Sequence, residues 1–349
     1  MRPEPNLEKR RHDVLSAVVR HYIANGLPVG SKTVASETME SLSPATIRNV
    51  MSQLESEGFL AQPHTSAGRI PTDKAYRYYV DRLMQLARLT PALAKFIDES
   101  LNSDDILNEQ LMAKASHVLA EVSSNVGLVL GPALEEKLLE YIKFIKLPDR
   151  RILVIIVSRP NLVENNVLRL DEDISQEELD RSAVYLNAEF RGWSLRTIRL
   201  EIFKKIEEAK QVFDRLLQSV GRLLMEGALG HDELGPLFVE GTARILEQPE
   251  FEDVREIKQL LRAFEEKAKL IKILGSYLQS SITGIKIVIG RENPANEMRH
   301  CALVMAPLVY RSRVVGALGV VGPTRMEYDR AVTAVDYVAH LCNRLLSVN

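Results

Sequence analysis

A segment near the start of the chain, residues 43–57, carries side chains whose types and spacing could do chemistry. Apolar residues recur there with helical spacing and define one inward face: Ile47, Val50, Met51 and Leu54. The opposite face is small and polar, with no acid before Glu55: Ala45, Asn49 and Ser52, flanked by Thr46, Arg48 and Gln53. Arg can form two hydrogen bonds with guanine, and Asn or Gln can do so with adenine. The pattern predicts a helix that reads base edges in the major groove of DNA.

The alternative interpretation is a helix face that simply lies in solvent. Asn and Ser are poor helix formers, and a solvated face is more often built from Lys and Glu. The composition of residues 45–53 therefore favours DNA reading. The candidates for base contacts are Arg48, Asn49, Ser52 and Gln53, with Thr46 at the edge of the groove.

The elements around this helix are predicted to follow the order of a winged helix-turn-helix. The expected helices cover residues 7–25, 32–39, 44–57 and 73–88, and the expected wing strands cover 59–62 and 68–71. Ser31 and Ser43 are the expected N-caps of the second and third helices, and Pro44 fits the first helical position. Gly68 is expected to supply a positive φ for a tight turn in the wing.

Contacts with the DNA backbone are expected from the second helix and the wing. Lys32 and Thr33 lie at a helix start, and residues 64–66 offer small donors for phosphates. Arg69 could reach a phosphate or a minor groove, whereas His64 alone is more typical of a surface loop. The predicted DNA-binding residues are Ser31, Lys32, Thr33, Ser43, Thr46, Arg48, Asn49, Ser52, Gln53, His64, Thr65, Ser66 and Arg69.

The composition excludes several other classes. The 349 residues predict two or three domains, and 46% apolar content does not fit a disordered chain. No apolar run approaches the ~20 residues that span a bilayer, and the first residues lack the apolar core of a secretion signal. Two cysteines cannot form a disulfide framework or a four-ligand zinc site, so we expect a cytoplasmic protein without a metal or cofactor. Residues 1–90 hold 12 Lys and Arg against 9 Asp and Glu, which permits DNA binding without requiring it.

The rest of the chain predicts an α+β multidomain protein with an interrupted domain. Strands are expected before and after a helix-rich segment, which indicates an insertion. The predicted division is a winged helix over 1–88, a linker over 89–103, a split domain over 104–171 and 257–349, and an inserted, mostly helical domain over 172–256. Trp193 fits either a dimer interface or the core of the insertion.

No catalytic pattern emerges, so an enzyme is not expected. The glycines at 316, 319 and 322 lack the Lys-Ser/Thr of a phosphate-binding loop and are more typical of close strand packing. His117 and His340 are expected to be structural, and Cys342 to be a buried, inert thiol.

Residues 44–80, PATIRNVMSQLESEGFLAQPHTSAGRIPTDKAYRYYV, resemble the signature of the HrcA heat-inducible transcription repressors. The resemblance continues in GSKT at 30–33, GTARIL at 241–246, IGREN at 289–293 and GALGVVGPTRMEYDRAV at 316–332. Three positions depart from the usual family pattern: Ala75, the pair Ala243-Arg244, and Arg291. None of them lies in the expected reading helix.

The resemblance implies a homodimeric bacterial repressor of chaperonin and chaperone operons. It implies binding to the inverted repeat called CIRCE, and an active state maintained by the GroE chaperonin. It further implies that the split domain is GAF-like and that the insertion is a dimerisation domain. We add the hypothesis that heat acts by local unfolding of the split domain or its insertion.

Two other functions fit the residues. A GAF-like domain that binds a metabolite would make the chain a ligand-responsive regulator. A helical N-terminus that contacts protein instead of DNA would make it a scaffold.

Overall fold

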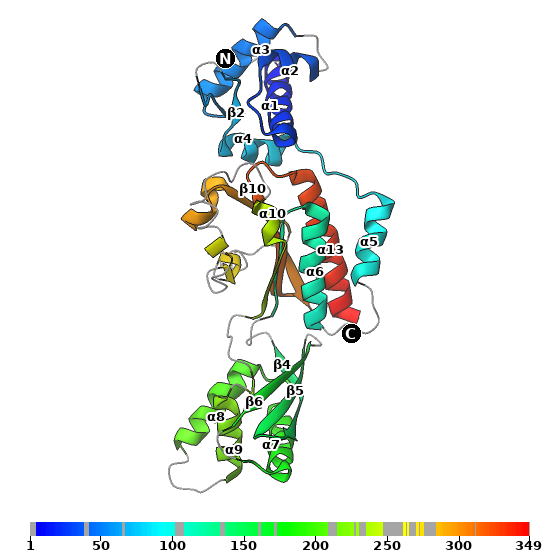
Figure 1. The fold of residues 1–349 in the computed structure, drawn as a ribbon, viewed down its shortest axis with the longest axis vertical. Coiled ribbons are helices and arrows are strands. Elements are labelled where there is room, and N and C mark those ends of the chain that lie inside the picture. Colours follow the sequence, from blue (N-terminus) through cyan, green and yellow to red (C-terminus); the bar gives the residue numbers. More distant parts are fainter. Residues whose placement is uncertain are drawn as a thin grey trace.

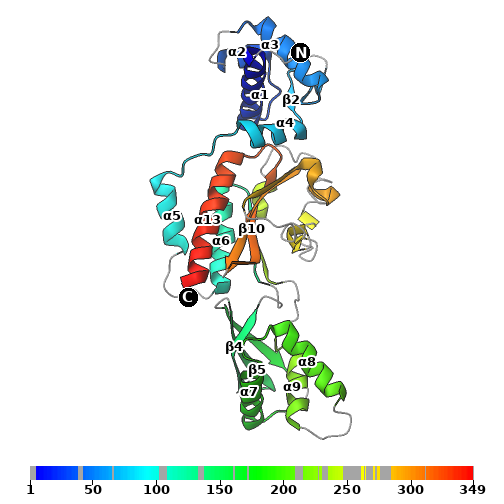
Figure 2. The same ribbon diagram turned by 180° about the vertical axis from the view of Figure 1, so that it is seen from behind.

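The computed structural model shows an elongated molecule with three parts along its long axis (Figures 1 and 2). It describes residues 5–37, 42–64, 67–101, 108–132, 137–159, 162–170, 173–208, 215–226, 228–229, 235–246, 261–262, 264, 270–271, 273–275, 284–310 and 312–348. The N-terminal part lies at one end, a central domain follows, and an inserted domain lies at the opposite end.

The N-terminal part has the predicted order of a winged helix. Its elements are α1 (Pro5–Asn25), α2 (Ser31–Glu37), α3 (Pro44–Ser56), β1 (Leu60–Ala61), β2 (Ile70–Pro71) and α4 (Asp73–Tyr78). β1 pairs antiparallel with β2, and Val29 pairs with Arg69 through two backbone hydrogen bonds of 2.9 Å each. The segment between α1 and α2 therefore extends the wing and fixes it against the helices.

The connection to the central domain differs from the prediction in two places. The helix expected over 73–88 ends in a π-helical turn, η1 (Tyr79–Leu83), after which Met84 is extended. The linker expected over 89–103 contains a helix, α5 (Pro91–Leu101). The Thr90 hydroxyl accepts a hydrogen bond from the Leu93 amide at 3.3 Å, and Ile97 and Leu101 are buried. Pro91 thus occupies the first position of a helix inside the segment that the sequence predicts to be a linker.

The central domain is built around a five-stranded antiparallel sheet in the order β7-β3-β10-β9-β8. Its elements are α6 (Asn108–Ser123), β3 (Val126–Leu130), β7 (Leu237–Glu240), α10 (Thr242–Leu246), β8 (Lys286–Ile289), η2 (Gly290–Glu292), η3 (Asn296–Met298), β9 (Cys301–Tyr310), β10 (Arg313–Pro323) and α13 (Tyr328–Val348). Helices α6 and α13 pack on one face of the sheet (Figure 1). The opposite face packs against Phe264, Leu270, Ile273 and Leu274.

The inserted domain has its own sheet and its own core. Its elements are β4 (Leu138–Leu147), β5 (Arg151–Arg159), β6 (Leu162–Arg169), α7 (Gln176–Phe190), α8 (Leu195–Glu208) and α9 (Arg215–Met225). The three strands pair antiparallel with one another, and apolar side chains of the strands and the three helices form one buried cluster. The domain is therefore α+β, with its helices on one face of an antiparallel sheet, rather than mostly helical.

These pairings correct the predicted boundaries of the insertion. The strands over 138–169 lie outside the expected insertion of 172–256, but they pair with each other and pack on α7–α9. β7 falls inside the expected insertion, but it pairs with β3 of the central sheet. The sequence shows where strands occur, whereas their assignment to a sheet depends on pairing partners distant in the chain.

The glycine run of β10 is confirmed as a device for close packing. A Cβ added at Gly316 would lie 2.2 Å from the carbonyl oxygen of Leu130. A Cβ added at Gly319 would lie 2.3 Å from the carbonyl oxygen of Val304. At Gly322 the added atom would lie 1.9 Å from the side chain of Asn125. The glycines therefore allow neighbouring backbone and side chains to approach.

The first prediction concerns the contact between α6 and the central sheet. A Cβ at Gly127 would lie 1.9 Å from the backbone oxygen of Ser116 in α6. We expect Gly127→Ala to lower the free energy of unfolding by about 1–3 kcal/mol, because α6 must shift away from β3. Gly275→Ala is the matched control, since an added Cβ there meets no atom within 4 Å. The measurement is urea denaturation monitored by circular dichroism. Equal urea midpoints for the two variants would contradict the assigned contact.

Candidate nucleic-acid interface

Helix α3 begins with the capping geometry that its sequence predicts. Ser43 is extended, with φ −65° and ψ 147°, and its hydroxyl accepts a hydrogen bond from the Thr46 amide at 3.1 Å. Pro44 occupies the first helical position, where a missing N–H costs nothing. The helix ends at Ser56, and Gly58 follows with φ +79°. These contacts fix which side chains α3 turns outward.

The predicted inward face of α3 is confirmed. The buried residues of the helix are Ile47, Val50, Met51 and Leu54. All five candidates for contact with bases or the groove edge are exposed: Thr46, Arg48, Asn49, Ser52 and Gln53. The helix therefore presents one cation, two amides and two hydroxyls on the surface that lies away from the core.

Arg69 of the wing is held against α3 rather than extended into solvent. Its Nε donates to a Glu55 carboxylate oxygen at 2.9 Å, and its Nη2 lies 3.4 Å from the Ser52 hydroxyl. The side chain is only 17% exposed. Arg69 thus offsets the charge of Glu55 beside the candidate reading face, a role that the sequence analysis missed because the two residues lie on different elements.

The wing depends on Gly68 for a different reason from the one predicted. Gly68 is absent from the residues with positive φ. An added Cβ would instead lie 2.5 Å from the carbonyl oxygen of Val29. The glycine is required for the close approach of the wing to the segment before α2.

The remaining predicted backbone contacts lie at two places. Ser31 is the first residue of α2 rather than its N-cap, Lys32 is exposed, and Thr33 is half-buried. His64 is exposed, and its carbonyl accepts a hydrogen bond from the Ala67 amide at 2.9 Å. Thr65 and Ser66 lie outside the residues that the structure describes.

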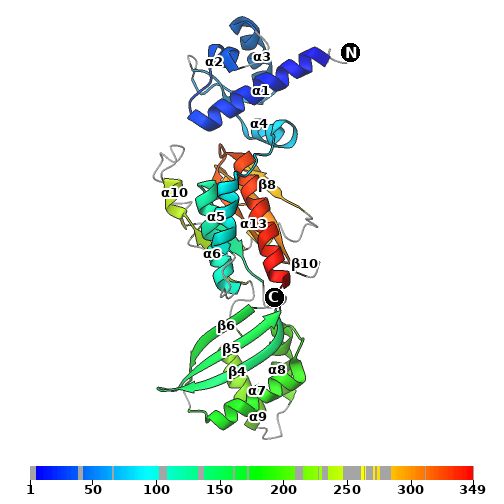
Figure 3. The same cartoon turned by 90° about the vertical axis from the view of Figure 1, so that its right-hand side faces the viewer.

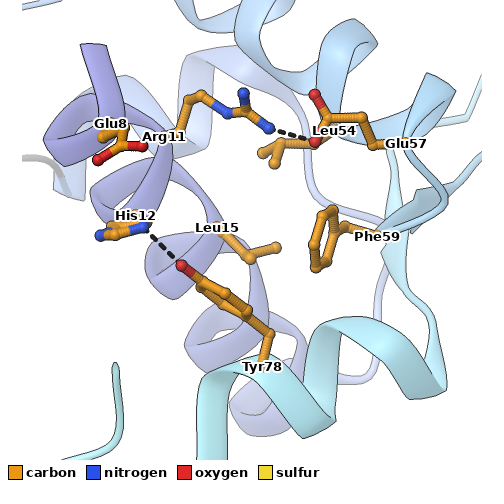
Figure 4. Close-up of a pocket in the computed structure, with 8 residues that line it drawn as sticks. All are labelled: Glu8, Arg11, His12, Leu15, Leu54, Glu57, Phe59 and Tyr78. Carbon is orange, nitrogen blue, oxygen red and sulfur yellow. Dashed lines mark hydrogen bonds and ion pairs between the residues drawn. The ribbon is translucent and has the colours of Figure 1, made fainter. Parts of the chain in front are cut away.

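A pocket of about 210 Å³ lies between α3, α1 and α4 (Figure 4). Arg11 of α1 pairs with Glu57, directly after α3. His12 Nε2 lies 2.6 Å from the Tyr78 hydroxyl, and the Tyr78 ring contacts Phe59 edge-on at 5.5 Å between centroids. Two pairs, Arg11 with Glu57 and His12 with Tyr78, thus span this pocket, so the pocket supports α3 structurally.

The two thiols and Trp193 lie far from this surface in the chain. Burial raises the pKa of the Cys301 and Cys342 thiols to about 12, so both are protonated and unreactive near neutral pH. Trp193 is 44% exposed and contacts Phe190 edge-on at 5.5 Å. Its ring therefore packs against the core of the insertion and stays partly exposed to solvent. Among the described helices, none has the length and apolar content to span a membrane.

Two family profiles match the chain. The profile described as "Winged helix-turn-helix transcription repressor, HrcA DNA-binding" covers residues 6–82, and the one described as "HrcA protein C terminal domain" covers residues 109–332. The chain belongs to the HrcA family. The predicted family and the predicted class, a DNA-binding transcription repressor rather than an enzyme, are thereby confirmed.

Known relatives of the HrcA family match the whole length of the chain. Proteins named heat-inducible transcription repressor HrcA from Geobacter sulfurreducens and Syntrophobacter fumaroxidans are 38% and 36% identical over 341 residues, covering 98% of each chain. A crystal structure of a hypothetical protein is 24% identical with a TM-score of 0.70, covering 97% of this chain and 98% of that one. That structure shows the same overall fold.

The second prediction tests the capping role of Ser43. Ser43→Ala removes the acceptor for the Thr46 amide, and we expect it to lower the free energy of unfolding by about 0.5–2 kcal/mol. Ser43→Asn keeps an acceptor at the cap and should retain wild-type stability. Urea denaturation of both variants is the measurement. A destabilised Ser43→Asn variant would contradict capping as the cause.

Proposed function

We propose that this chain is a homodimeric repressor that binds the inverted repeat CIRCE upstream of chaperonin and chaperone operons. The observation that carries the proposal is the exposed polar face of α3, beside which Arg69 offsets the charge of Glu55. Such a surface admits close approach to DNA, and its Arg and amide side chains match the donors and acceptors of base edges. Ser31, Lys32, Thr33, His64, Thr65 and Ser66 are proposed to contact the DNA backbone.

An inverted repeat requires a two-fold dimer, in which each protomer reads one half-site. The inserted domain offers a surface for it (Figure 3). Its helices pack on one face of the sheet, while the other face carries apolar side chains outside that cluster: Tyr141, Ile145, Leu153, Ile155, Val157, Val163 and Val167. Tyr141 and Val167 are each 49% exposed. Burial of this face against a second copy supports the proposal of a dimerisation domain.

The remaining parts of the proposal rest on the family resemblance. The central domain is proposed to be GAF-like, and its antiparallel sheet with α6 and α13 on one face is consistent with that assignment. The repressor is proposed to act in the cytoplasm, to bind the nucleoid at its operator, and to depend on the GroE chaperonin for its active state. Loss of the active dimer on heating would release the promoter.

The third prediction tests sequence-specific binding. Titration of the purified chain with a CIRCE duplex and a scrambled duplex at two salt concentrations should show tighter binding to CIRCE. Each good base contact discriminates by about 1–3 kcal/mol, so Arg48→Ala/Asn49→Ala should lower CIRCE affinity by roughly one to four orders of magnitude. Affinity for scrambled DNA should change much less, because it depends mainly on phosphate contacts. Equal wild-type affinity for both duplexes, with and without added chaperonin, would contradict the proposal.

The fourth prediction tests the dimer. Ile155 lies on the middle strand of the open sheet face, and Ile155→Glu should convert the dimer to a monomer in sedimentation equilibrium, because a charge would be buried at the interface. Val184→Glu is the matched control, since Val184 is 68% exposed on α7, away from the open sheet face. A dimer that survives Ile155→Glu would place the interface elsewhere.

A further inference from the structure

The winged helix and the central domain meet at a joint that is centred on Arg77 of α4. Arg77 Nε donates to a Glu292 carboxylate oxygen at 2.8 Å, and Nη2 donates to the Ile287 carbonyl at 2.8 Å and also to Glu292. Glu292 in turn accepts a hydrogen bond from the Ile289 amide at 2.9 Å. The guanidinium plane is therefore held by a side chain and by the backbone of β8.

The pKa values of the pair agree with this geometry. Burial alone would raise the pKa of Glu292, but the hydrogen bonds from Arg77 and from the Ile289 amide lower it below its ordinary value. The hydrogen bond to Glu292 likewise raises the pKa of Arg77. Both groups are ionised near neutral pH.

A second contact joins Asp73, the first residue of α4, to the turn after β8. The Asp73 carboxylate accepts a hydrogen bond from the Arg291 amide at 3.0 Å. Gly290 has φ +54°, and a Cβ there would lie 2.4 Å from the Asp73 carboxylate. The glycine thus permits the backbone conformation and the close approach together.

A third contact joins the end of α1 to the loop before α13. Arg325 Nη1 donates to the Ile23 carbonyl at 3.0 Å. A Cβ at Gly26, which has φ +67° and follows α1, would lie 3.3 Å from the Arg325 guanidinium carbon. A cation near the last carbonyls of a helix donates hydrogen bonds to acceptors that have no partner within the helix. It also interacts favourably with the negative end of the helix dipole.

Between these contacts, the rings of Tyr76 and Tyr328 lie 6.0 Å apart at 45°, and both are buried. They belong to one apolar cluster that runs from α1 and α3 to α6 and α13. Apolar burial is non-directional, so it holds the two domains together without fixing their relative rotation. The bonds of Asp73 and Arg77, which both belong to α4, and the bond of Arg325, which precedes α13, surround this contact and fix the relative rotation of the two domains.

This fixed rotation matters because of where the joint lies. The winged helix and the inserted domain lie at opposite ends of the long axis (Figures 1 and 2). In a dimer formed through the insertion, the separation and angle of the two α3 helices depend on the joint in each protomer. A small rotation there moves α3, at the far end, along the DNA.

We propose that Asp73, Arg77 and Arg325 are positioning residues for operator binding, which orient each winged helix so that a dimer matches one half-site separation. The proposal rests on the proposed function, since it requires a dimer and an inverted repeat. It assigns a role to the motifs at residues 73–77, 289–293 and 324–325, which do not belong to the reading surface.

The fifth prediction tests the joint with the full-length chain and three kinds of duplex. These are the inverted repeat, the same repeat with its spacer changed by one to five base pairs, and a single half-site. Wild type should prefer one spacing. Arg77→Ala should bind the half-site as wild type does, lose at least 10-fold in affinity for the repeat, and discriminate less between spacings.

Two variants control for charge. Arg82→Ala removes the same charge from an exposed position in the next helical turn, and it should behave as wild type. Glu292→Gln removes a negative charge from the central domain, which by electrostatics alone would strengthen DNA binding. The joint predicts the opposite, a weaker repeat affinity with unchanged half-site affinity. The double exchange Arg77→Glu/Glu292→Arg should recover part of the spacing preference.

The outcomes distinguish the two proposals. If wild type binds repeat and scrambled duplexes equally, the proposed function fails and positioning for an operator fails with it. If wild type prefers the repeat but Arg77→Ala and Glu292→Gln keep its spacing preference, only the positioning role is overturned. An equal loss of half-site and repeat affinity in Arg77→Ala also overturns it, because Arg77 would then act within the winged helix.

Discussion

The contact between Tyr76 and Tyr328 joins the winged helix and the central domain into one core, and the placement of α3 relative to the rest of the molecule depends on that continuity. Full burial of a large side chain stabilises by roughly 1.5–3 kcal/mol. The Tyr76 hydroxyl is buried without a hydrogen-bond partner within the described residues, which costs about 1–3 kcal/mol. The neighbouring Arg77–Glu292 pair is partly exposed, and such pairs contribute about 0–1 kcal/mol. The net stabilisation of the joint is therefore smaller than its buried area indicates.

The inserted domain, in contrast to the winged helix, does not share a hydrophobic core with the central domain. Its core is a separate cluster of apolar residues from three strands and three helices, and it is connected to the central domain by two passes of the chain that include Gly131 and Gly235. Backbone hydrogen bonding between those passes includes the Gly131 amide and the Pro236 carbonyl, 2.8 Å apart. A domain with its own core can be inserted into a strand connection because loop-closure entropy grows only slowly with length. The proposed function assigns DNA binding to one end of the protein and association to the other.

Local patterns predicted the winged helix and α3 well, because the relevant signals are close in sequence. Ser43-Pro44 determines where α3 begins, and the spacing of Ile47, Val50 and Leu54 determines its inward face. The helix α5 inside the predicted linker was missed because a proline such as Pro91 can either end a helix or begin one. Only the burial of Ile97 and Leu101 shows that it begins one here. The boundaries of the insertion were misplaced because strand pairing between β3 and β7 spans more than a hundred residues. No local pattern encodes such a pairing.

The same limit applies to the candidate site. Exposure of Arg48 and Asn49 follows from the helical period, whereas the partner of Arg69 does not, since Glu55 lies 14 residues earlier on another element. That pair changes how the reading surface works. An unpaired Glu55 would repel phosphates, and an unpaired Arg69 would attract them without regard to sequence. In the proposed complex with DNA, pairing the two removes both effects from one end of α3, so that discrimination is left to the candidate base-contacting side chains. Under the proposed function, the wing contributes to specificity by keeping the Arg69 charge away from the DNA backbone.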